Sequence, residues 1–224
     1  MEKNFHLAII CDGNRRWAKA RGMMPWDGHR VAIENFRSTI DWCRDNPRIG
    51  ALTLWAFSTE NWDRDPKEVA ELMRLFDRFM RSEMDHIEEK KTRFVHQGRK
   101  DRIPASLAAL FADGEERTKH FTEFTLQIAI DHGGKDEIVR AVNRIPAGTP
   151  VTAESIRAHL DNPEVPDIDF VIRTSGEIRT SGYQMWRAAY AEWFFPTYHF
   201  PELGPEKLQE ALDEYDRRQR RFGK

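Results

Sequence analysis

The chain has 224 residues, 32% of them charged, and its 35 basic and 37 acidic residues leave a formal net charge of −2. This length fits one domain with a sizeable core, and the near balance of charge argues against a nucleic-acid-binding protein. No apolar run approaches the roughly 20 residues of a membrane span, and no segment has the make-up of a signal peptide. We therefore expect one cytoplasmic domain over residues 1–224, with at most peripheral membrane contact.

Apolar periodicity predicts strands and helices that alternate along the chain. In chain order, strands are expected at 6–11, 51–57, 92–96, 124–130 and 170–172, and helices at 29–44, 66–87, 104–119, 135–144, 152–160 and 205–221. Such alternation favours an α/β fold, a mostly parallel central sheet with helices on its faces.

The segment after the first strand, Asp-Gly-Asn-Arg-Arg at 12–16, is the most informative part of the chain. Glycine lets backbone N–H groups approach an anion, a helix start offers unpaired donors, and arginine matches phosphate oxygens. Asp12 adds an oxygen ligand of the kind that Mg²⁺ prefers. The alternative is an ordinary strand–turn–helix corner, in which Asp12 merely caps the following helix.

Two more predicted strands end in polar turns. Residues 58–64 read Ser-Thr-Glu-Asn-Trp-Asp-Arg, and residues 173–182 contain arginines, hydroxyls and glycines. In open α/β sheets, ligands bind beyond the carboxyl ends of the strands. If the three turns share that edge, they form one site for a highly anionic substrate.

These blocks resemble the signature sequences of cis-prenyltransferases, the undecaprenyl diphosphate synthase family. The resemblance is carried, in order, by residues 12–18, 28–30, 56–64, 172–181, 186–192 and 220–223. It implies a cis-prenyltransferase fold with a hydrophobic tunnel, Mg²⁺ as cofactor and a homodimer. It also implies condensation of an allylic diphosphate with a homoallylic one, usually isopentenyl diphosphate, and release of pyrophosphate. The DDxxD motif of the trans-acting synthases does not occur in the sequence.

The resemblance assigns roles to individual residues. Asp12 would bind Mg²⁺ and activate the leaving group, Glu192 would aid the metal, and Asn61 would help to handle the proton lost from the second substrate. The residues expected to be catalytic are Asp12, Ser58, Asn61 and Arg64. Those expected to bind substrate are Gly13, Asn14, Arg15, Arg16, Trp17, His29, Trp62, Arg173, Arg179, Ser181 and Arg221, the last reaching the partner's site in the dimer.

Several of these residues have plainer explanations. Ser58 and Asn61 could be turn formers, and His29 an ordinary surface or core histidine. Glu192, an acid in an apolar stretch, needs a partner or a metal. Arg221 could belong to a frayed basic tail.

The chain also departs from the family pattern. Residues 23–27, Met-Met-Pro-Trp-Asp, lack an arginine that the family commonly has before Gly-His. Arg15 stands where glycine is usual and can supply replacement charge. Gly182 stands where asparagine is usual. These changes cluster on diphosphate recognition rather than on the fold.

Bulky residues on the helix that starts at Pro66, namely Phe76, Phe79, Met80 and Met84, predict a short tunnel and a product of about C10 to C20. Ordinary core packing of these side chains is the alternative. The altered diphosphate site also allows head-to-middle condensation of dimethylallyl diphosphate to a branched, lavandulyl-type product. Two further alternatives are a catalytically silent subunit of a heteromeric prenyltransferase and a non-catalytic lipid-phosphate binder.

Overall fold

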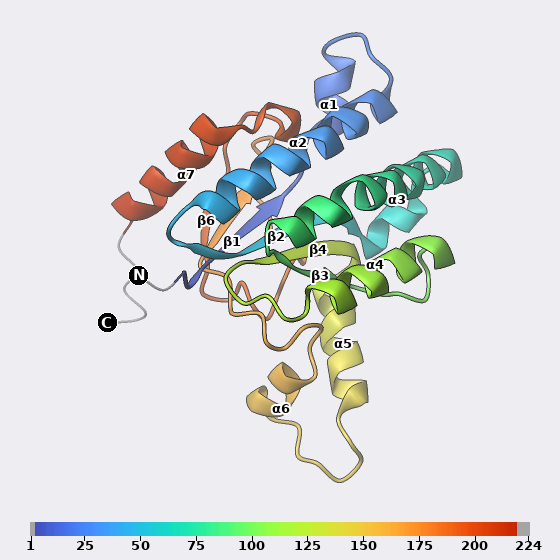
Figure 1. Ribbon diagram of the computed structural model, residues 1–224, viewed down its shortest axis with the longest axis vertical. Helices are drawn as coiled ribbons and strands as arrows, with labels where there is room; N and C mark the ends of the chain where they lie inside the picture. Colours follow the sequence, from blue (N-terminus) through green and yellow to red (C-terminus); the bar gives the residue numbers. More distant parts are fainter. Residues whose placement is uncertain (1–2, 219–224) are drawn as a thin grey trace.

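The computed structural model describes residues 3–218, which form a six-stranded sheet flanked by helices (Figure 1). The strands are β1 (Phe5–Ile10), β2 (Ile49–Ser58), β3 (Arg93–Gln97), β4 (Thr125–His132), β5 (Phe170–Arg173) and β6 (Glu192–Phe194). Their order is β3-β4-β2-β1-β5-β6, and every neighbouring pair is parallel. The α/β fold with a parallel central sheet is therefore confirmed.

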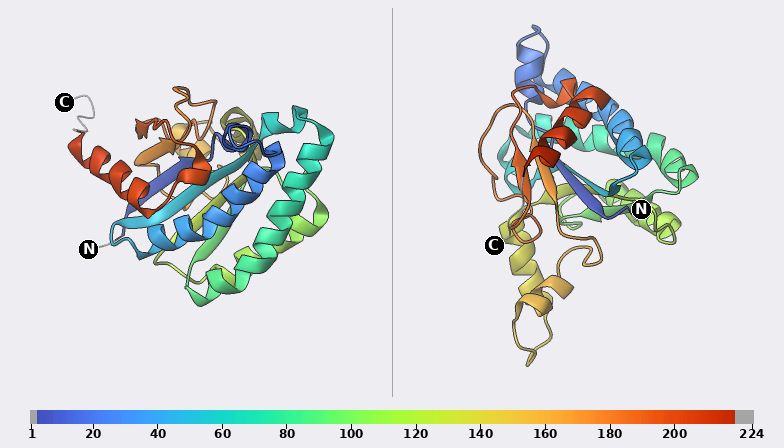
Figure 2. Two further views of the ribbon diagram at one scale, coloured as in Figure 1. Left: turned by 90° about the horizontal axis from the view of Figure 1, so that it is seen from above. Right: turned by 90° about the vertical axis from the view of Figure 1, so that its left-hand side faces the viewer.

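Seven α-helices and two short 3₁₀ helices are described. They are α1 (Asn14–Lys19), α2 (Pro25–Asp45), η1 (Thr59–Asp63), α3 (Pro66–Glu89), α4 (Ala105–Thr118), α5 (Gly134–Arg144), α6 (Ala153–Ala158), η2 (Phe200–Glu202) and α7 (Pro205–Arg217). The helices α7, α2, α3 and α4 lie side by side, in that order, over one face of the sheet (Figure 2, left), and successive members of this layer are in contact. Helices α5 and α6 lie away from this layer (Figure 1).

The strand β1 is buried on both faces, with alternate side chains in two separate cores. Leu7 and Ile9 belong to the larger core under the helix layer. Ala8 and Ile10 belong to a smaller core on the opposite face, together with Trp55 and others. A central parallel strand covered on both sides needs a continuous apolar run, which is why its sequence predicts a strand so clearly.

The element boundaries differ from the predicted ones where local chemistry decides them. Helix α2 starts at Pro25 rather than at residue 29, because proline suits the first helical position and Asp27 accepts a hydrogen bond from the Met24 N–H group. Strand β6 was not predicted, since it has only three residues, all half-buried, and so shows no apolar pattern. Among residues 3–218, no helix combines the length and the apolar character needed to cross a bilayer.

Strand β1 lies where the order of the strands across the sheet reverses: β2, β4 and β3 lie on one side of it, and β5 and β6 on the other. Its partner on one side is β2, the next strand in sequence, and on the other side it pairs with β5. At such a switch point the loops after neighbouring strands diverge and leave a crevice at the carboxyl ends. The polar turns after β1, β2 and β5 meet at this edge.

Candidate active site

A cavity of about 510 Å³ lies at the carboxyl ends of β1, β2 and β5. Its lining includes twelve of the residues predicted to be functional: Asp12, Gly13, Asn14, Arg15, Arg16, His29, Ser58, Asn61, Arg64, Arg173, Arg179 and Ser181. Segments that are up to about 170 residues apart in the sequence thus share one cavity.

Asp12 lines this cavity and lies two residues after the end of β1. One carboxylate oxygen, Oδ2, accepts a hydrogen bond from Nη2 of Arg173 at 2.9 Å, and Oδ1 accepts one from the Gly13 N–H group at 2.7 Å. Burial alone would raise the pKa of Asp12, but the hydrogen bond and charge of Arg173 outweigh it and hold the pKa below its ordinary value. The carboxylate is therefore ionised and 28% exposed to the cavity.

The turn after Asp12 requires glycine. Gly13 has a φ of +96°, and a Cβ atom there would lie 2.5 Å from Nδ1 of His199 and 2.7 Å from Oγ of Ser175. Both distances are too short for any side chain, and a positive φ disfavours other residues. The glycine thus lets the backbone pass tightly between the cavity and the loop at 175–199.

Arg173 ties the turn after β5 to the turn after β1. Its buried guanidinium donates through Nη1 to the backbone oxygen of Arg179 at 2.6 Å and to Oγ of Ser181 at 2.8 Å, besides its bond to Asp12. At the rim, Glu177 accepts a hydrogen bond from Nη1 of Arg16 at 2.7 Å and pairs with Arg179. The three arginines and Asp12 form one connected charge network.

The turn after β2 contains Asn61, which stabilises the turn and also lines the cavity. Oδ1 of Asn61 accepts a hydrogen bond from the Ser58 N–H group at 3.1 Å, so the turn-forming explanation holds for this contact. The nearby His29 is buried, and burial followed by the charge of Arg64 lowers its pKa to about 4. His29 is therefore a neutral imidazole near neutral pH.

Four of the predicted site residues are not among those lining the cavity. Trp17 packs under the guanidinium of Arg21 at 4.2 Å, and Trp62 lines a separate, mostly apolar cavity of about 750 Å³ between α3 and the start of α4. In the pairing of β5 with β6, Glu192 lies beside Phe170, and Phe170 and Arg173 are the two ends of β5. The carboxylate of Glu192 lies 3.4 Å from Nη1 of Arg218. Arg221 lies outside the described residues. The roles of these four stay predictions.

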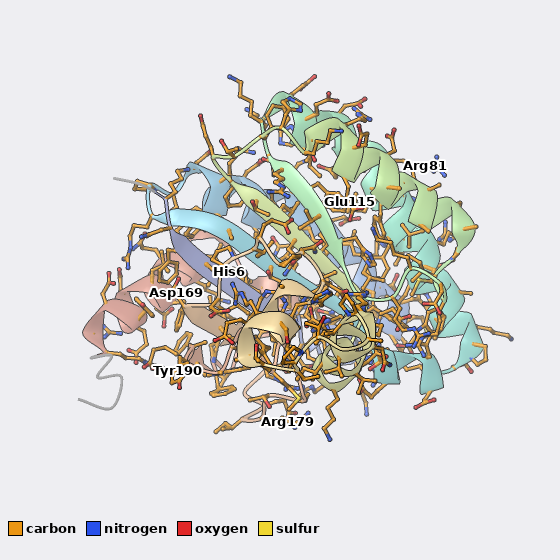
Figure 3. All side chains as sticks on the ribbon, turned by 90° about the horizontal axis from the view of Figure 1, so that it is seen from below. His6, Arg81, Glu115, Asp169, Arg179 and Tyr190 are labelled. Atoms are coloured by element: carbon orange, nitrogen blue, oxygen red, sulfur yellow. The ribbon has the colours of Figure 1, made fainter. Side chains whose placement is uncertain are left out.

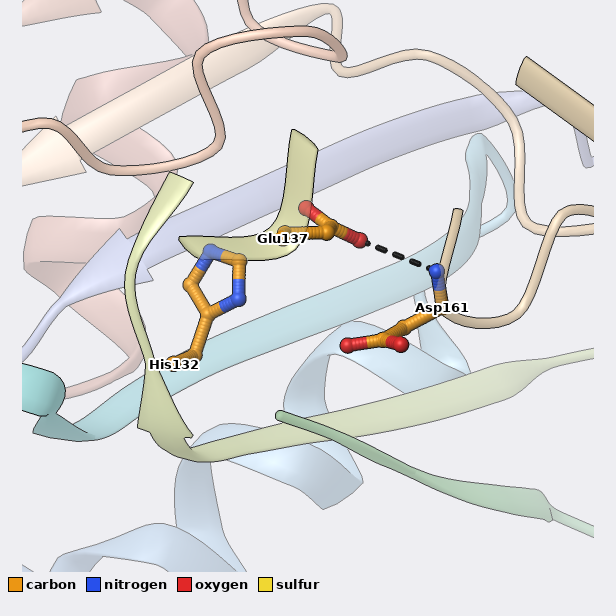
Figure 4. A group of neighbouring side chains, drawn as sticks. All are labelled: His132, Glu137 and Asp161. Atoms are coloured by element: carbon orange, nitrogen blue, oxygen red, sulfur yellow. Dashed lines mark hydrogen bonds between the residues drawn. The ribbon is translucent and has the colours of Figure 1, made fainter. Parts of the chain in front are cut away.

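Asp12 is the one predicted metal ligand that faces the cavity. A different group in the described part of the chain, His132, Glu137 and Asp161, holds its ligand atoms within 4.8 Å of one another (Figure 4). None of the three lines the cavity, and both carboxylates are already paired with arginines, Glu137 with Arg187 at 3.0 Å and Asp161 with Arg140 at 2.6 Å. Since Mg²⁺ prefers oxygen ligands and usually keeps several of its own waters, this buried, arginine-paired group suits it less well than Asp12.

A small cavity of about 20 Å³, lined mostly by apolar residues, adjoins the polar one and shares Cys11, Asn14, His29 and Ala56 with it. It is closed by residues of α2 and α3, namely Ala32, Ile33, Phe36, Leu72 and Phe76. This volume is about that of one water molecule. The space between α2 and α3 beside the polar cavity is therefore nearly filled.

Sequence reasoning missed the apolar wall of the polar cavity and one acid at its rim. These residues are Ile10, Cys11, Trp55, Ala56, Phe57 and Glu177. All lie inside or next to the motifs at the strand ends, and that position was the available signal. Their side-chain directions depend on the pleat and twist of the sheet, which a motif does not reveal.

Comparisons with known proteins agree with this geometry. Residues 10–223 match the prenyltransferase family model of undecaprenyl diphosphate synthases. The isoprenyl transferase of Fusobacterium nucleatum is 40% identical over 229 residues, covering 100% of this chain and 98% of the relative. That of Treponema pallidum is 40% identical over 224 residues, covering 97% of this chain and 98% of the relative.

Two solved structures are similar over nearly their whole length. The crystal structure of lavandulyl diphosphate synthase from Lavandula x intermedia, in complex with dimethylallyl diphosphate, has a TM-score of 0.90 and 30% identity, covering 99% of each chain. That of a probable undecaprenyl diphosphate synthase from Campylobacter jejuni has a TM-score of 0.84 and 29% identity, covering 100% of each chain.

Proposed function

The chain belongs to the prenyltransferase family of undecaprenyl diphosphate synthases, and we propose that it joins an allylic diphosphate head to tail with isopentenyl diphosphate. The product would be a short Z-prenyl diphosphate, with pyrophosphate released. The observation that carries this proposal is the network of Asp12, Arg16, Arg173 and Arg179 in a cavity beside a small apolar pocket. The charged groups suit a diphosphate, and the apolar side chains of Ile10, Trp55 and Phe57 in the same cavity suit a short hydrocarbon tail.

The residues of the cavity match the demands of the reaction. The leaving pyrophosphate is highly charged, and the arginine side chains offer fixed donors to its oxygens. Mg²⁺ bound at Asp12 would neutralise part of that charge. Positive charge develops on the allylic carbon as the bond breaks, and the apolar side chains of Ile10, Trp55 and Phe57 keep water away from it.

The second substrate must lose a proton after the new carbon–carbon bond forms. Asn61 lies on the cavity wall, held by its bond to the Ser58 N–H group. We assign Asn61 the task of orienting the group that accepts this proton. Arg173, Arg179 and Ser181 bind the diphosphate of the second substrate, on the side of the cavity formed by the turn after β5.

A short product is supported by the filled pocket. Phe76 and Phe36 close the apolar cavity, and Phe79 packs edge to face on Phe36 with 5.5 Å between ring centroids. A well-packed interior cannot also hold many isoprene units. This packing supports a short product, for which we keep the proposed range of about C10 to C20.

A second candidate is the head-to-middle condensation of two dimethylallyl diphosphates to a branched, lavandulyl-type diphosphate. It is favoured by the similarity to lavandulyl diphosphate synthase, in complex with dimethylallyl diphosphate, and by the small apolar pocket. Two five-carbon substrates need no long tunnel.

A homodimer completes the proposal. Apolar side chains that are exposed in the single chain gather in the segment after β5, with Ile178 at 81%, Tyr190 at 77% and Met185 at 43% exposure. Figure 3 shows Tyr190 and Arg179 on the side of the molecule opposite to Arg81 of the helix layer. A partner covering this side would bury them, and sedimentation should then give twice the chain mass of 26.3 kDa.

Product analysis tests the proposed function. The protein is incubated with Mg²⁺ and dimethylallyl, geranyl or farnesyl diphosphate, each with and without isopentenyl diphosphate, and the dephosphorylated products are sized and examined by NMR. A linear Z-alkene that requires isopentenyl diphosphate is expected. A branched product formed without it would support the second candidate. No product from any pair would favour a silent subunit, or a lipid-phosphate binder if pyrophosphate still stabilises the fold.

A further inference from the structure

Glu68, in the first turn of α3, lies close to three side chains from separate parts of the chain, two arginines and one neutral histidine. Its Oε1 lies 3.1 Å from Nη1 of Arg64 and 3.4 Å from Nε2 of His29, and its Oε2 lies 3.6 Å from Nη1 of Arg15. Arg15 belongs to α1, His29 to α2, and Arg64 follows η1. The Glu68 side chain is only 15% exposed.

Glu68 lies behind these groups rather than among them. Arg15, His29 and Arg64 all line the 510 Å³ cavity, whereas Glu68 is not among its lining residues. Its carboxylate thus contacts three side chains of the cavity wall without lining the cavity itself. A substrate in the cavity would meet these three side chains before it met Glu68.

An acid in the first turn of a helix has a simpler explanation, because it interacts favourably with the helix dipole. That explanation requires neither burial nor partners from other elements. Glu71, three residues further along α3, pairs only within its own helix, with Arg74, and is 33% exposed. Glu68 differs from it in both respects.

The contacts with Glu68 leave most N–H donors of Arg15 and Arg64 available for a substrate. Each guanidinium has five N–H donors. Arg64 donates one hydrogen bond to Glu68, and Arg15 lies at ion-pair distance from the carboxylate. The two arginines are close enough to repel each other, since the charge of Arg15 contributes to lowering the pKa of Arg64, after burial and against the opposing effect of Glu68. The carboxylate offsets this repulsion while leaving donors for phosphate oxygens.

We propose that Glu68 is a positioning residue of the diphosphate site, whose carboxylate holds Arg15, His29 and Arg64 in place for the phosphate oxygens of the substrate. This inference rests on the proposed function of the cavity. Arg15 is the positive charge that compensates for the stretch at 23–27, and Glu68 gives its long side chain a fixed position. Ordering such side chains before the substrate arrives lowers the cost of binding.

Replacement of Glu68 by glutamine distinguishes a positioning role from a purely electrostatic one, because the two predict opposite changes in the affinity for an anion. Removal of a negative charge near an anion site should by itself tighten anion binding. Loss of positioning should weaken it, since two arginine side chains must then be ordered on binding. For Glu68→Gln we expect the Kd of inorganic pyrophosphate and the KM of the allylic diphosphate to rise about tenfold, with a much smaller change in kcat.

The matched control is Glu71→Gln, which removes the same charge from the same helix and should leave both constants at wild-type values. Glu68→Asp, which keeps the charge but withdraws it from Arg15, His29 and Arg64, should give an intermediate loss, and it also serves if the glutamine variant does not fold. Arg15→Gln should cost less in the Glu68→Gln background than in the wild type, because its position is already lost.

Pyrophosphate binding is measured by calorimetry without turnover, so the inference can be judged separately from the proposed function. If the wild type binds pyrophosphate but forms no prenyl product, the proposed function fails, and the ratio of the Kd values still decides the role of Glu68. Binding by Glu68→Gln that equals or exceeds that of the wild type would overturn the inference. A wild type that does not bind pyrophosphate would overturn both.

Discussion

The ion pair of Asp12 and Arg173 sets the charge at the centre of the cavity. Arg173 is nearly buried, and its guanidinium is shared among Asp12, Ser181 and the backbone of Arg179. A buried cation held this way keeps a fixed position, so its spare donors are pre-organised for phosphate oxygens. Asp12 in turn stays ionised because of Arg173, which suits a metal ligand.

Asp12→Asn should reduce Mg²⁺-dependent turnover by at least about a hundredfold while leaving the fold intact. The amide keeps the shape of the side chain but removes the charge that would hold the metal. Without Mg²⁺, inorganic pyrophosphate should bind the variant at least as tightly as the wild type, because a repelling charge is gone. Turnover within a fewfold of the wild type would contradict the assigned role.

The predictability of the site depends on which residues are considered. Asp12, Asn61 and Arg173 could be placed from sequence because each follows an apolar strand, and parallel strands bring their carboxyl ends to one edge. Glu68 could not, because its importance lies in distances to residues of three other elements. Glu192 illustrates the reverse case: its motif suggests a site residue, yet within the described chain it pairs with Arg218.

At the scale of elements, α3 links the fold to the product. Its Phe76, Phe79, Met80 and Met84 are all buried, as expected for one face of an amphipathic helix. Core packing, one of the two sequence-based explanations, is confirmed for all four, and closure of the tunnel stays a prediction that rests on Phe76, which also lines the small cavity beside the active site. Periodicity predicted the helix well but could not show which buried residue borders the substrate.

Phe76→Leu should lengthen the longest product by about one isoprene unit, because it opens the end of the apolar pocket. The exchange removes less volume than a Phe→Ala change, which costs about 3–5 kcal/mol, so the fold should persist. Chromatography of the dephosphorylated products gives the chain length.

Phe111→Leu is the matched control, since Phe111 is fully buried on α4 against Phe94 and His96, away from both cavities. It should lower stability without changing the product. An equal shift in chain length for both variants, or none for Phe76→Leu, would refute the assignment of α3.

At the scale of the whole molecule, buried histidines govern the response to acid. Burial lowers the pKa of His6 to about 4 and that of His96 to about 3, so both are neutral in the folded protein. In the unfolded chain they regain a pKa of about 6.5 and bind protons that the folded chain does not. Stability should therefore fall as the pH drops from about 6.5 towards 4, by on the order of 1.4 kcal/mol per pH unit for each histidine.

Urea denaturation at several pH values measures this slope. Asp161, whose pKa is held at about 2 by Arg140 against the opposing effect of burial, contributes stability that is lost only below about pH 4. It therefore does not mask the histidine effect. A free energy of unfolding that is constant between pH 6.5 and 4.5 would contradict the burial of neutral histidines.

The most direct test of the central claim is a continuous assay of pyrophosphate release with Mg²⁺, comparing wild type with Arg173→Gln. The wild type should release one pyrophosphate for each new carbon–carbon bond, and only when both an allylic diphosphate and isopentenyl diphosphate are present. Arg173→Gln should release it far more slowly, because it loses the donor shared by Asp12 and the turn after β5. Equal rates for the two proteins, or no release by the wild type with any substrate pair, would contradict the proposal that this cavity carries out the condensation.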